Sequence, residues 1–297
     1  MVDRYKNWDS KPYAFTYLDI FTEFPGDHFW DHSNGAFIKF WIKAYKEIKA
    51  ANPELKVGGP GFAAIVSAKI SEGDGNLAED LLTEMYNQGL HLDWLGWHTF
   101  GPIPTKYAKE AQGYEDLLNG TGAFKKVPWA DKGFFDNTEV FTDAYGNGGD
   151  NEAQSKIKFV SVSTAEGASI LTAGWIALQY ADIQGAFYYR GNDQGSPTQS
   201  KSKKEGGGDK IPGLFTSSGG YKTSANAFKL WSEITKKYSS LLKVTGGNDE
   251  IYVLAATNSS GGISLLISNT TEKDTTISIN VSGKDMMSFS KATAYEV

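Results

Sequence analysis

Polar side chains follow several aromatic and β-branched segments of the sequence, at the points where each segment would end as a strand. Thr22 and Glu23 close YAFTYLDIFTE, His98 lies near the end of LDWLGWHTF, and Glu139 or Asp143 closes a strand within GFFDNTEVFTDAY. Two carboxyl groups facing each other across a pocket can hydrolyse a glycosidic bond, because one protonates the bridging oxygen while the other attacks the anomeric carbon. Glu23 and Glu139 are the expected pair, with Asp143 as the alternative second carboxylate.

The elements that must position these residues alternate between strands and helices. Residues 13–23, 55–60, 92–100 and 184–193 and part of 133–145 are predicted strands, and residues 33–51, 77–88, 106–118, 155–180 and 224–237 are predicted helices. Such alternation indicates parallel strands joined by crossover helices, in an α/β barrel or a doubly wound sheet. No glycine-rich dinucleotide or phosphate motif follows a strand, which favours the (β/α)8 TIM-barrel type. Barrel enzymes carry their reacting residues at the carboxyl ends of the strands.

The last part of the chain has a different pattern. From about residue 241 it consists of short β-rich runs at 251–257, 262–269 and 275–282, separated by turns. These runs predict a small antiparallel module, too small to be stable alone. We therefore expect a partial barrel domain over residues 1–240 and a β-rich accessory module over 241–297. The polar run at 196–210 is a predicted surface loop.

Composition narrows the classes of partner. The net charge of -6 argues against nucleic acid, and no apolar run is long enough for a membrane span. The chain has no Cys and only four His, so we predict neither a metal site nor a cofactor. Aromatic residues make up 13% of the chain, many of them beside polar residues. Flat apolar rings next to hydrogen-bonding groups suit an oligo- or polysaccharide, although packing explains more than half of these rings.

Several of these segments together resemble the family 39 glycoside hydrolases, clan A barrels that include β-xylosidases. The resemblance rests on YLDIFTEFPGDHFW, the amphipathic helix after it, and IKAANPELKVGGP, which match the acid/base region of that family. LDWLGWHTFG, NTEVF and AFYYRGND are similar to its sixth, seventh and eighth strands. The resemblance implies a retaining glycosidase with Glu23 as the acid/base and Glu139 as the nucleophile.

The sequence departs from the family pattern at the site itself. Thr22 stands where the family has Asn before the acid/base, and Val140 stands where an aromatic residue commonly follows the nucleophile. Asp143 lies four residues after Glu139, in the same phase of a strand, so it also satisfies the pattern of a second carboxylate. From the sequence, the second carboxylate can therefore be either Glu139 or Asp143.

Other residues near the predicted strand ends are candidates for contacting the sugar. Trp30, Trp97 and Tyr145 could stack on sugar rings, with packing in the barrel as the alternative. The full set of predicted substrate-binding residues is Thr22, Trp30, Trp97, His98, Asp143, Tyr145, Tyr188, Arg190 and Asn192.

The resemblance makes residues 13–23 the fourth strand of a barrel. We therefore expect the first three strands to come from a preceding segment, a partner protein or a second copy of the chain. No signal peptide is recognised in the polar start of the sequence, and an extracellular or periplasmic location is expected if a preceding segment carries one. Two rival functions use the same scaffold: a glycan-binding protein without catalysis, and a structural subunit of an assembly.

Overall fold

The chain divides into two compact units, each with its own sheet. The computed structural model describes residues 15–25, 29–146, 163–192, 213–216, 218–246, 248–282 and 293–295. The first unit comprises Met1–Phe100, Lys106–Tyr145 and Leu178–Tyr188, and the second comprises Gly101–Thr105, Gly146–Ala177 and Tyr189–Val297. The predicted domain boundary at residue 240 falls inside the second unit, and as a boundary between folding units it stays a prediction.

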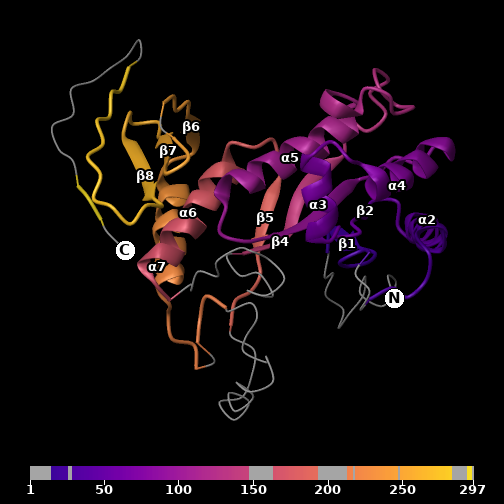
Figure 1. Ribbon diagram of the computed structural model, residues 1–297, viewed down its shortest axis with the longest axis horizontal. Helices are drawn as coiled ribbons and strands as arrows, with labels where there is room; N and C mark the ends of the chain where they lie inside the picture. Colours follow the sequence, from indigo (N-terminus) through magenta and orange to yellow (C-terminus); the bar gives the residue numbers. More distant parts are fainter. Residues whose placement is uncertain are drawn as a thin grey trace. The chain divides into compact units, whose positions relative to one another are not determined.

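A five-stranded parallel sheet organises the first unit (Figure 1). Its strands are β1 (Tyr17–Asp19), β2 (Lys56–Gly58), β3 (Trp94–Phe100), β4 (Glu139–Gly146) and β5 (Gly185–Tyr188), and they lie side by side in chain order. Consecutive parallel strands with intervening helices are the arrangement of successive units of a (β/α)8 barrel. The sheet is a curled half-barrel of this type, which confirms the predicted fold class.

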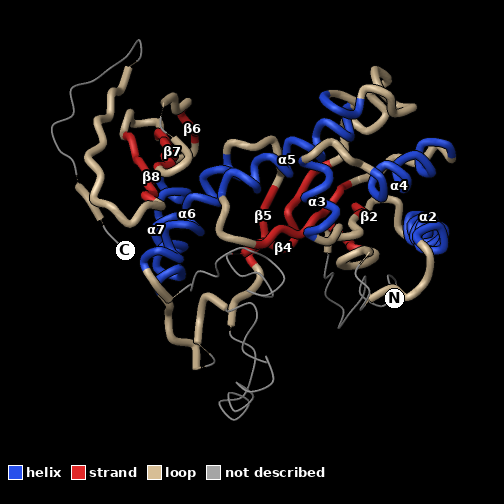
Figure 2. The backbone as a smooth tube through the Cα atoms, in the orientation of Figure 1, coloured by secondary structure: helices blue, strands red, loops and turns tan. Residues whose placement is uncertain are grey.

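The helices of the first unit pack against one face of this sheet (Figure 2). They are α2 (Asn34–Ala51), α3 (Ala64–Ser71), α4 (Asn76–Asn87) and α5 (Pro104–Asn119). Ser33 caps α2: its side chain accepts a hydrogen bond from the Ala36 amide. The short helix α3 was not predicted from the sequence.

Large apolar side chains fill the layer between the helices and the sheet. Phe37 and Trp41 of α2, Met85 of α4 and Leu95 and Trp97 of β3 are each completely buried. Burying a large apolar side chain stabilises a fold by roughly 1.5–3 kcal/mol, so this layer is the main source of stability of the first unit.

The opposite face of the sheet carries aromatic rings and, at the amino ends of its strands, an ion pair. The rings of Tyr17, Trp94 and Phe141 meet edge to face, with centroids 5.5 to 6.4 Å apart. Lys56, the first residue of β2, pairs there with Glu139, the first residue of β4. This ion pair therefore joins the amino ends of β2 and β4 through their side chains.

The second unit contains an antiparallel sheet and two helices. Strands β6 (Ser240–Leu242), β7 (Ile251–Thr257) and β8 (Ile263–Asn269) pair in that order, and the helices are α6 (Ala165–Gln179) and α7 (Thr223–Lys237). Ile176 of α6 packs with Leu254 and Leu266 of the sheet. The predicted strand at 275–282 is not formed, and β6 is the third strand of this sheet. The predicted loop at 196–210 lies outside the described residues.

No helix among the described residues is long and apolar enough to cross a membrane.

Candidate active site

Glu23 lies in a tightly held turn after β1. The predicted strand at 13–23 is shorter in the structure, where β1 ends at Asp19. The carboxyl group of Asp19 accepts a hydrogen bond from the Phe21 amide. Residues 13 and 14 lie outside the described range. Glu23 has a positive φ of 53°, a conformation that costs about 1–3 kcal/mol outside glycine.

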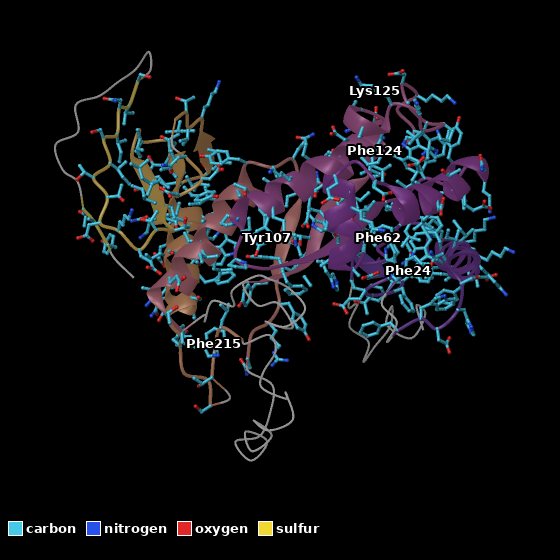
Figure 3. All side chains as sticks on the ribbon, in the orientation of Figure 1. Phe24, Phe62, Tyr107, Phe124, Lys125 and Phe215 are labelled. Atoms are coloured by element: carbon cyan, nitrogen blue, oxygen red, sulfur yellow. The ribbon has the colours of Figure 1, made fainter. Side chains whose placement is uncertain are left out.

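The next residue, Phe24, holds this turn in place. Its ring is buried and stacks on Phe37 with centroids 3.6 Å apart, and its carbonyl accepts a hydrogen bond from the Ala63 amide. Phe24 and Phe62 come from adjacent extended segments and are labelled in Figure 3. Truncating a buried Phe typically costs about 3–5 kcal/mol, more than the strain at Glu23. The buried anchor therefore outweighs the strain and fixes the position of the glutamate.

His98 of β3 joins Glu23 to a second carboxylate. Its Nδ1 lies 3.0 Å from Glu23 Oε1, and its Nε2 lies 3.6 Å from Asp143 Oδ2. The backbone of His98 is fixed on both sides, since its amide donates to the Phe62 carbonyl and its carbonyl accepts from Ser67 Oγ. The imidazole is nearly buried, whereas the Glu23 side chain is 37% exposed. Glu23 is thus the member of this trio that solvent, and hence a substrate, reaches most easily.

Asp143 of β4 fits against two glycines. A Cβ at Gly61 would lie 2.9 Å from Asp143 Oδ2, and a Cβ at Gly96 would lie 2.9 Å from its Cγ. Gly61 also has a positive φ of 55°, which a side chain would disfavour. The glycine of the turn after β2 and the glycine of β3 therefore make room for the carboxylate beside His98.

The pKa of His98 is raised from 6.5 to about 9. Burial alone would lower it, but hydrogen bonds and charge attraction from Asp143 and Glu23 outweigh burial. The protonated imidazole is therefore favoured at neutral pH.

This shift predicts a specific dependence of stability on pH. The folded state binds the His98 proton more tightly than the unfolded state, so the stabilisation is complete below about pH 6.5 and is lost as the pH rises through about 9. The free energy of unfolding should fall across this window in the wild type and fall less steeply in His98→Asn. Denaturant titrations at several pH values measure both slopes. Equal slopes would show that His98 carries no raised pKa.

The structure does not bring Glu139 to Glu23. Glu139 begins β4 and pairs with Lys56 at the amino end of the sheet, while Asp143 lies four residues further, about 13 Å along the strand. Barrel sites lie at the carboxyl ends of strands, so the predicted placement of Glu139 opposite Glu23 is wrong. Asp143, the alternative from the sequence, occupies that place.

Two of the aromatic residues predicted to contact the sugar are buried elsewhere. Trp97 has no exposed surface and packs against Tyr114 of α5, on the face of the sheet opposite to His98. Tyr145 is 1% exposed and contacts the ring of Tyr107. Both predictions are corrected for the same reason: these rings belong to the packing of the helices on the sheet.

The remaining predicted residues have varied positions. Trp30 is partly exposed and packs edge to face on Phe21 and Phe37, in a cluster beside the turn that holds Glu23. Thr22 is exposed next to Glu23, and Tyr188 ends β5 with its ring against Tyr145.

Arg190 and Asn192 belong to the second unit. The Arg190 carbonyl accepts a hydrogen bond from the Leu214 amide, and Asn192 forms a β-bridge with Phe215. Their predicted role in binding sugar stays a prediction.

Asp19 is a site residue that the sequence analysis missed. A Cβ at Gly61 would lie 3.5 Å from Asp19 Oδ2 and 3.2 Å from His98 Nε2, so these groups converge with Asp143 on one glycine. The signal was present in the sequence, because Asp19 shares the phase of Tyr17 in a strand and precedes the turn to Glu23 by a few residues. Because the strand was predicted to continue to Glu23, Asp19 was assigned to the middle of the strand and not to its carboxyl end.

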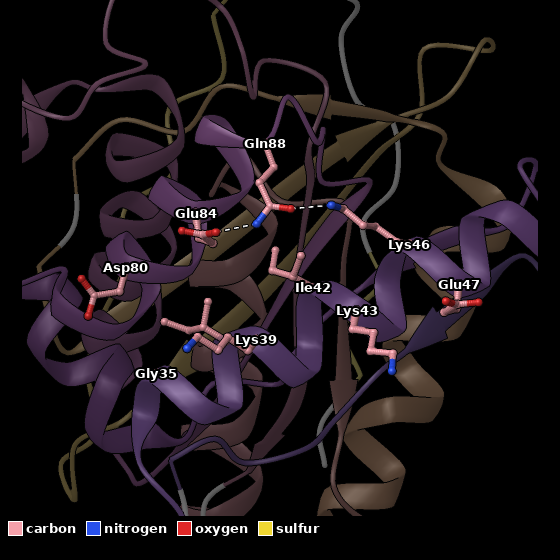
Figure 4. A pocket seen from close by; sticks show the side chains of 10 residues that line it. Gly35, Lys39, Ile42, Lys43, Lys46, Glu47, Asp80, Glu84 and Gln88 are labelled. Carbon is pink, nitrogen blue, oxygen red and sulfur yellow. Dashed lines mark hydrogen bonds between the residues drawn. The ribbon is translucent and has the colours of Figure 1, made fainter.

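A separate groove of ≈ 510 Å³ lies between α2 and α4. Figure 4 shows Lys46 donating to Gln88, which donates to Glu84, across this groove. Its lining comes from these two helices and includes none of the residues around His98. Within the described part of the chain, no cluster of three or more His, Asp or Glu residues is arranged to hold a metal ion.

Comparisons with known proteins give a structural likeness only. No protein-family model matches the chain, and no curated protein matches it in sequence. A glucosidase from Croceicoccus marinus is 20% identical over 90% of this chain and 52% of its own, with a TM-score of 0.62. A family 51 α-L-arabinofuranosidase from Bifidobacterium longum is 11% identical over 80% of this chain and 50% of its own, with a TM-score of 0.51.

A third solved structure contains a sugar. It is a variant of a GH128 (subgroup I) endo-β-1,3-glucanase from Amycolatopsis mediterranei in complex with laminaripentaose, 14% identical over 73% of this chain and 72% of its own, with a TM-score of 0.48. The present chain spans about half the length of the glucosidase and of the arabinofuranosidase. These three structural neighbours are glycoside hydrolases, and the first two share the barrel-type fold of this chain.

Proposed function

We propose that the chain carries the catalytic site of an O-glycoside hydrolase, with Glu23 as the acid/base and Asp143 as the second carboxylate. The observation that carries the proposal is the imidazole of His98, which contacts a carboxylate oxygen of Glu23 with one nitrogen and one of Asp143 with the other. Glu23 follows β1, and His98 and Asp143 lie in the carboxyl-terminal halves of β3 and β4, on the side where barrel enzymes bind substrate. The glycoside hydrolase neighbours support the same reaction class.

In the proposed reaction, Glu23 gives its proton to the glycosidic oxygen as the bond from that oxygen to the anomeric carbon breaks. Asp143 supplies the second carboxylate, and His98 holds both carboxylates in place. The resemblance to family 39 implies retention, with Glu139 as the nucleophile. In this proposal Asp143 takes that role: it attacks the anomeric carbon, and Glu23 then activates the water that releases the sugar. The motifs around Glu23 and KVGGP support the assignment to that family type.

Hydrolysis of a panel of oligo- and polysaccharides, with the product anomer followed by NMR, tests this function. A product with retained configuration supports the assignment, and an inverted product would give Asp143 the role of activating a water molecule. Saturable binding without any hydrolysis across the panel would contradict the enzyme.

A glycan-binding protein without catalysis is the second candidate. Two observations favour it: Thr22 replaces the Asn that precedes the acid/base in family 39 enzymes, and the second carboxylate is an Asp, one methylene shorter than the expected Glu. The Glu23→Gln variant distinguishes the enzyme from the glycan-binding protein. An enzyme loses turnover while it keeps affinity for the sugar, whereas a binding protein has no turnover to lose.

A companion segment at the outer edge of β1 is also part of the proposal. Among the described residues, no strand pairs with that edge, and Tyr17 is 42% exposed there, while Phe187 is 58% exposed on β5, at the other edge. Unpaired edges with exposed apolar residues recruit further chains. We expect a preceding segment, a partner protein or a second copy to pair with β1.

Native mass measurement and sedimentation of the 297-residue chain test this expectation. Species heavier than 32.4 kDa, or loss of folded structure on isolation, are the expected results. A stable, well-folded monomer would contradict it.

A further inference from the structure

The carboxyl group of Asp19 is fixed against the turn that follows β2. Its Oδ1 accepts a hydrogen bond from the Phe21 amide at 3.1 Å. A Cβ at Gly59 would lie only 1.9 Å from the same oxygen, and the φ of Gly59 is 91°. Any side chain at Gly59 would displace the carboxyl group, so the glycine and the amide together define where Asp19 lies.

The second oxygen of Asp19 faces the proposed catalytic trio. Asp143 Oδ2, His98 Nε2 and Asp19 Oδ2 lie 2.9, 3.2 and 3.5 Å from the position that a Cβ at Gly61 would take. Asp19 therefore belongs to the same cluster as Asp143, although neither the reaction scheme nor the resemblance gives it a role.

The charge state of Asp19 follows from these neighbours. Burial of the carboxyl group, and then the negative charge of Asp143 and hydrogen bonding to it, raise the pKa of Asp19, while the Phe21 amide and His98 act in the opposite direction. Asp19 lies on an edge strand and is exposed as a residue, so solvent weakens the effect of burial. The repulsion from Asp143 still raises the pKa, because only one of two adjacent carboxyl groups ionises readily.

Among the described residues, the charged side chains with the largest effect on Asp19 come from the neighbouring strands. From β3 the group facing Asp19 is His98, and from β4 it is Asp143. The turn after β2 contributes the two glycines, and Glu23 reaches the cluster through Nδ1 of His98.

We propose, on the basis of the hydrolase function above, that Asp19 is a positioning residue that stays protonated and donates a hydrogen bond to Asp143. Asp143 is then the ionised member of the pair, held in one orientation towards the anomeric carbon. Asp19 itself touches neither the substrate nor the breaking bond.

The variants Asp19→Asn and Asp19→Ala separate this role from its alternatives. The Asn amide donates the same hydrogen bond but cannot ionise, so Asp19→Asn should keep hydrolysis at neutral pH. Ala removes the donor, and kcat should fall about tenfold or more with little change in KM. Asp80→Asn, an exposed change on α4, is the matched control and should leave both constants unchanged.

Loss of neutral-pH hydrolysis in Asp19→Asn would overturn the proposal, because it would show that Asp19 works as a carboxylate.

A measurement without substrate keeps this inference separate from the hydrolase function. Carboxyl ¹³C NMR should show Asp19 titrating above its ordinary value of 3.8 in the wild type, and lower in Asp143→Asn. If the pKa of Asp19 shifts in this way but neither the wild type nor any variant hydrolyses a glycoside, the hydrolase function is refuted. The coupling between the two carboxyl groups is then still established. If the chain hydrolyses glycosides but the pKa of Asp19 is the same in the wild type and in Asp143→Asn, only the positioning role is refuted.

Discussion

Replacing Glu23 by Gln is expected to lower kcat/KM by about 10²- to 10⁴-fold on glycosides with poor leaving groups. Gln keeps the shape of the side chain and its contact distance to His98 but cannot transfer a proton. Substrates with good leaving groups, which need little protonation, should lose much less. The comparison of two leaving groups therefore identifies the missing step as proton transfer rather than binding.

The matched control for this change is Glu47→Gln, on the exposed face of α2. It removes the same charge far from His98 and should leave turnover unchanged on both substrates. Unchanged turnover in Glu23→Gln itself would remove Glu23 from the mechanism.

The second large effect distinguishes Asp143 from Glu139. Asp143→Asn should lower kcat/KM at least as much as Glu23→Gln and on every leaving group, because the second carboxylate is needed whichever bond is broken. Glu139→Gln should keep the turnover of the wild type, since its carboxylate pairs with Lys56 at the amino end of the sheet.

Thermal unfolding measured alongside the kinetics completes this comparison. Glu139→Gln breaks the ion pair with Lys56, so its melting temperature should fall while its turnover is kept. The opposite pattern, with an inactive Glu139→Gln and an active Asp143→Asn, would restore the assignment implied by NTEVF.

The sequence was sufficient to predict elements whose signals are local. Helix α2 begins at a capping Ser33 and ends before Pro53, and its apolar residues recur at helical spacing. The order of parallel strands followed from the alternation of such elements. These signals depend on neighbours in the chain, so they could be recognised without the fold.

The position of Glu139 depended on contacts from distant parts of the chain. Glu139 and Asp143 share one phase of β4, so alternation could not decide which lies nearer the carboxyl end. The start of the strand is set by β3 and β2: the Glu139 amide donates to the Asp93 carbonyl, and its carboxylate pairs with Lys56. Neither contact is visible in the local pattern.

The error at Trp97 had a local signal. Adjacent residues of a strand point to opposite faces, so Trp97 and His98 could not both face one pocket. Since His98 faces the carboxylates, alternation alone assigns Trp97 to the helical layer, where the structure places it.

The left-handed backbone at Glu23 has a consequence for how the sequence can change over time. At a φ of 53°, Gly or Asn has a lower conformational energy than Glu. Selection for stability alone therefore favours replacing this residue. A lineage that no longer needed the carboxyl group would gain stability by losing it, and the first substitution would be difficult to reverse. Under the proposed function, the glutamate at this strained position supplies the acid/base at the expense of a more stable fold.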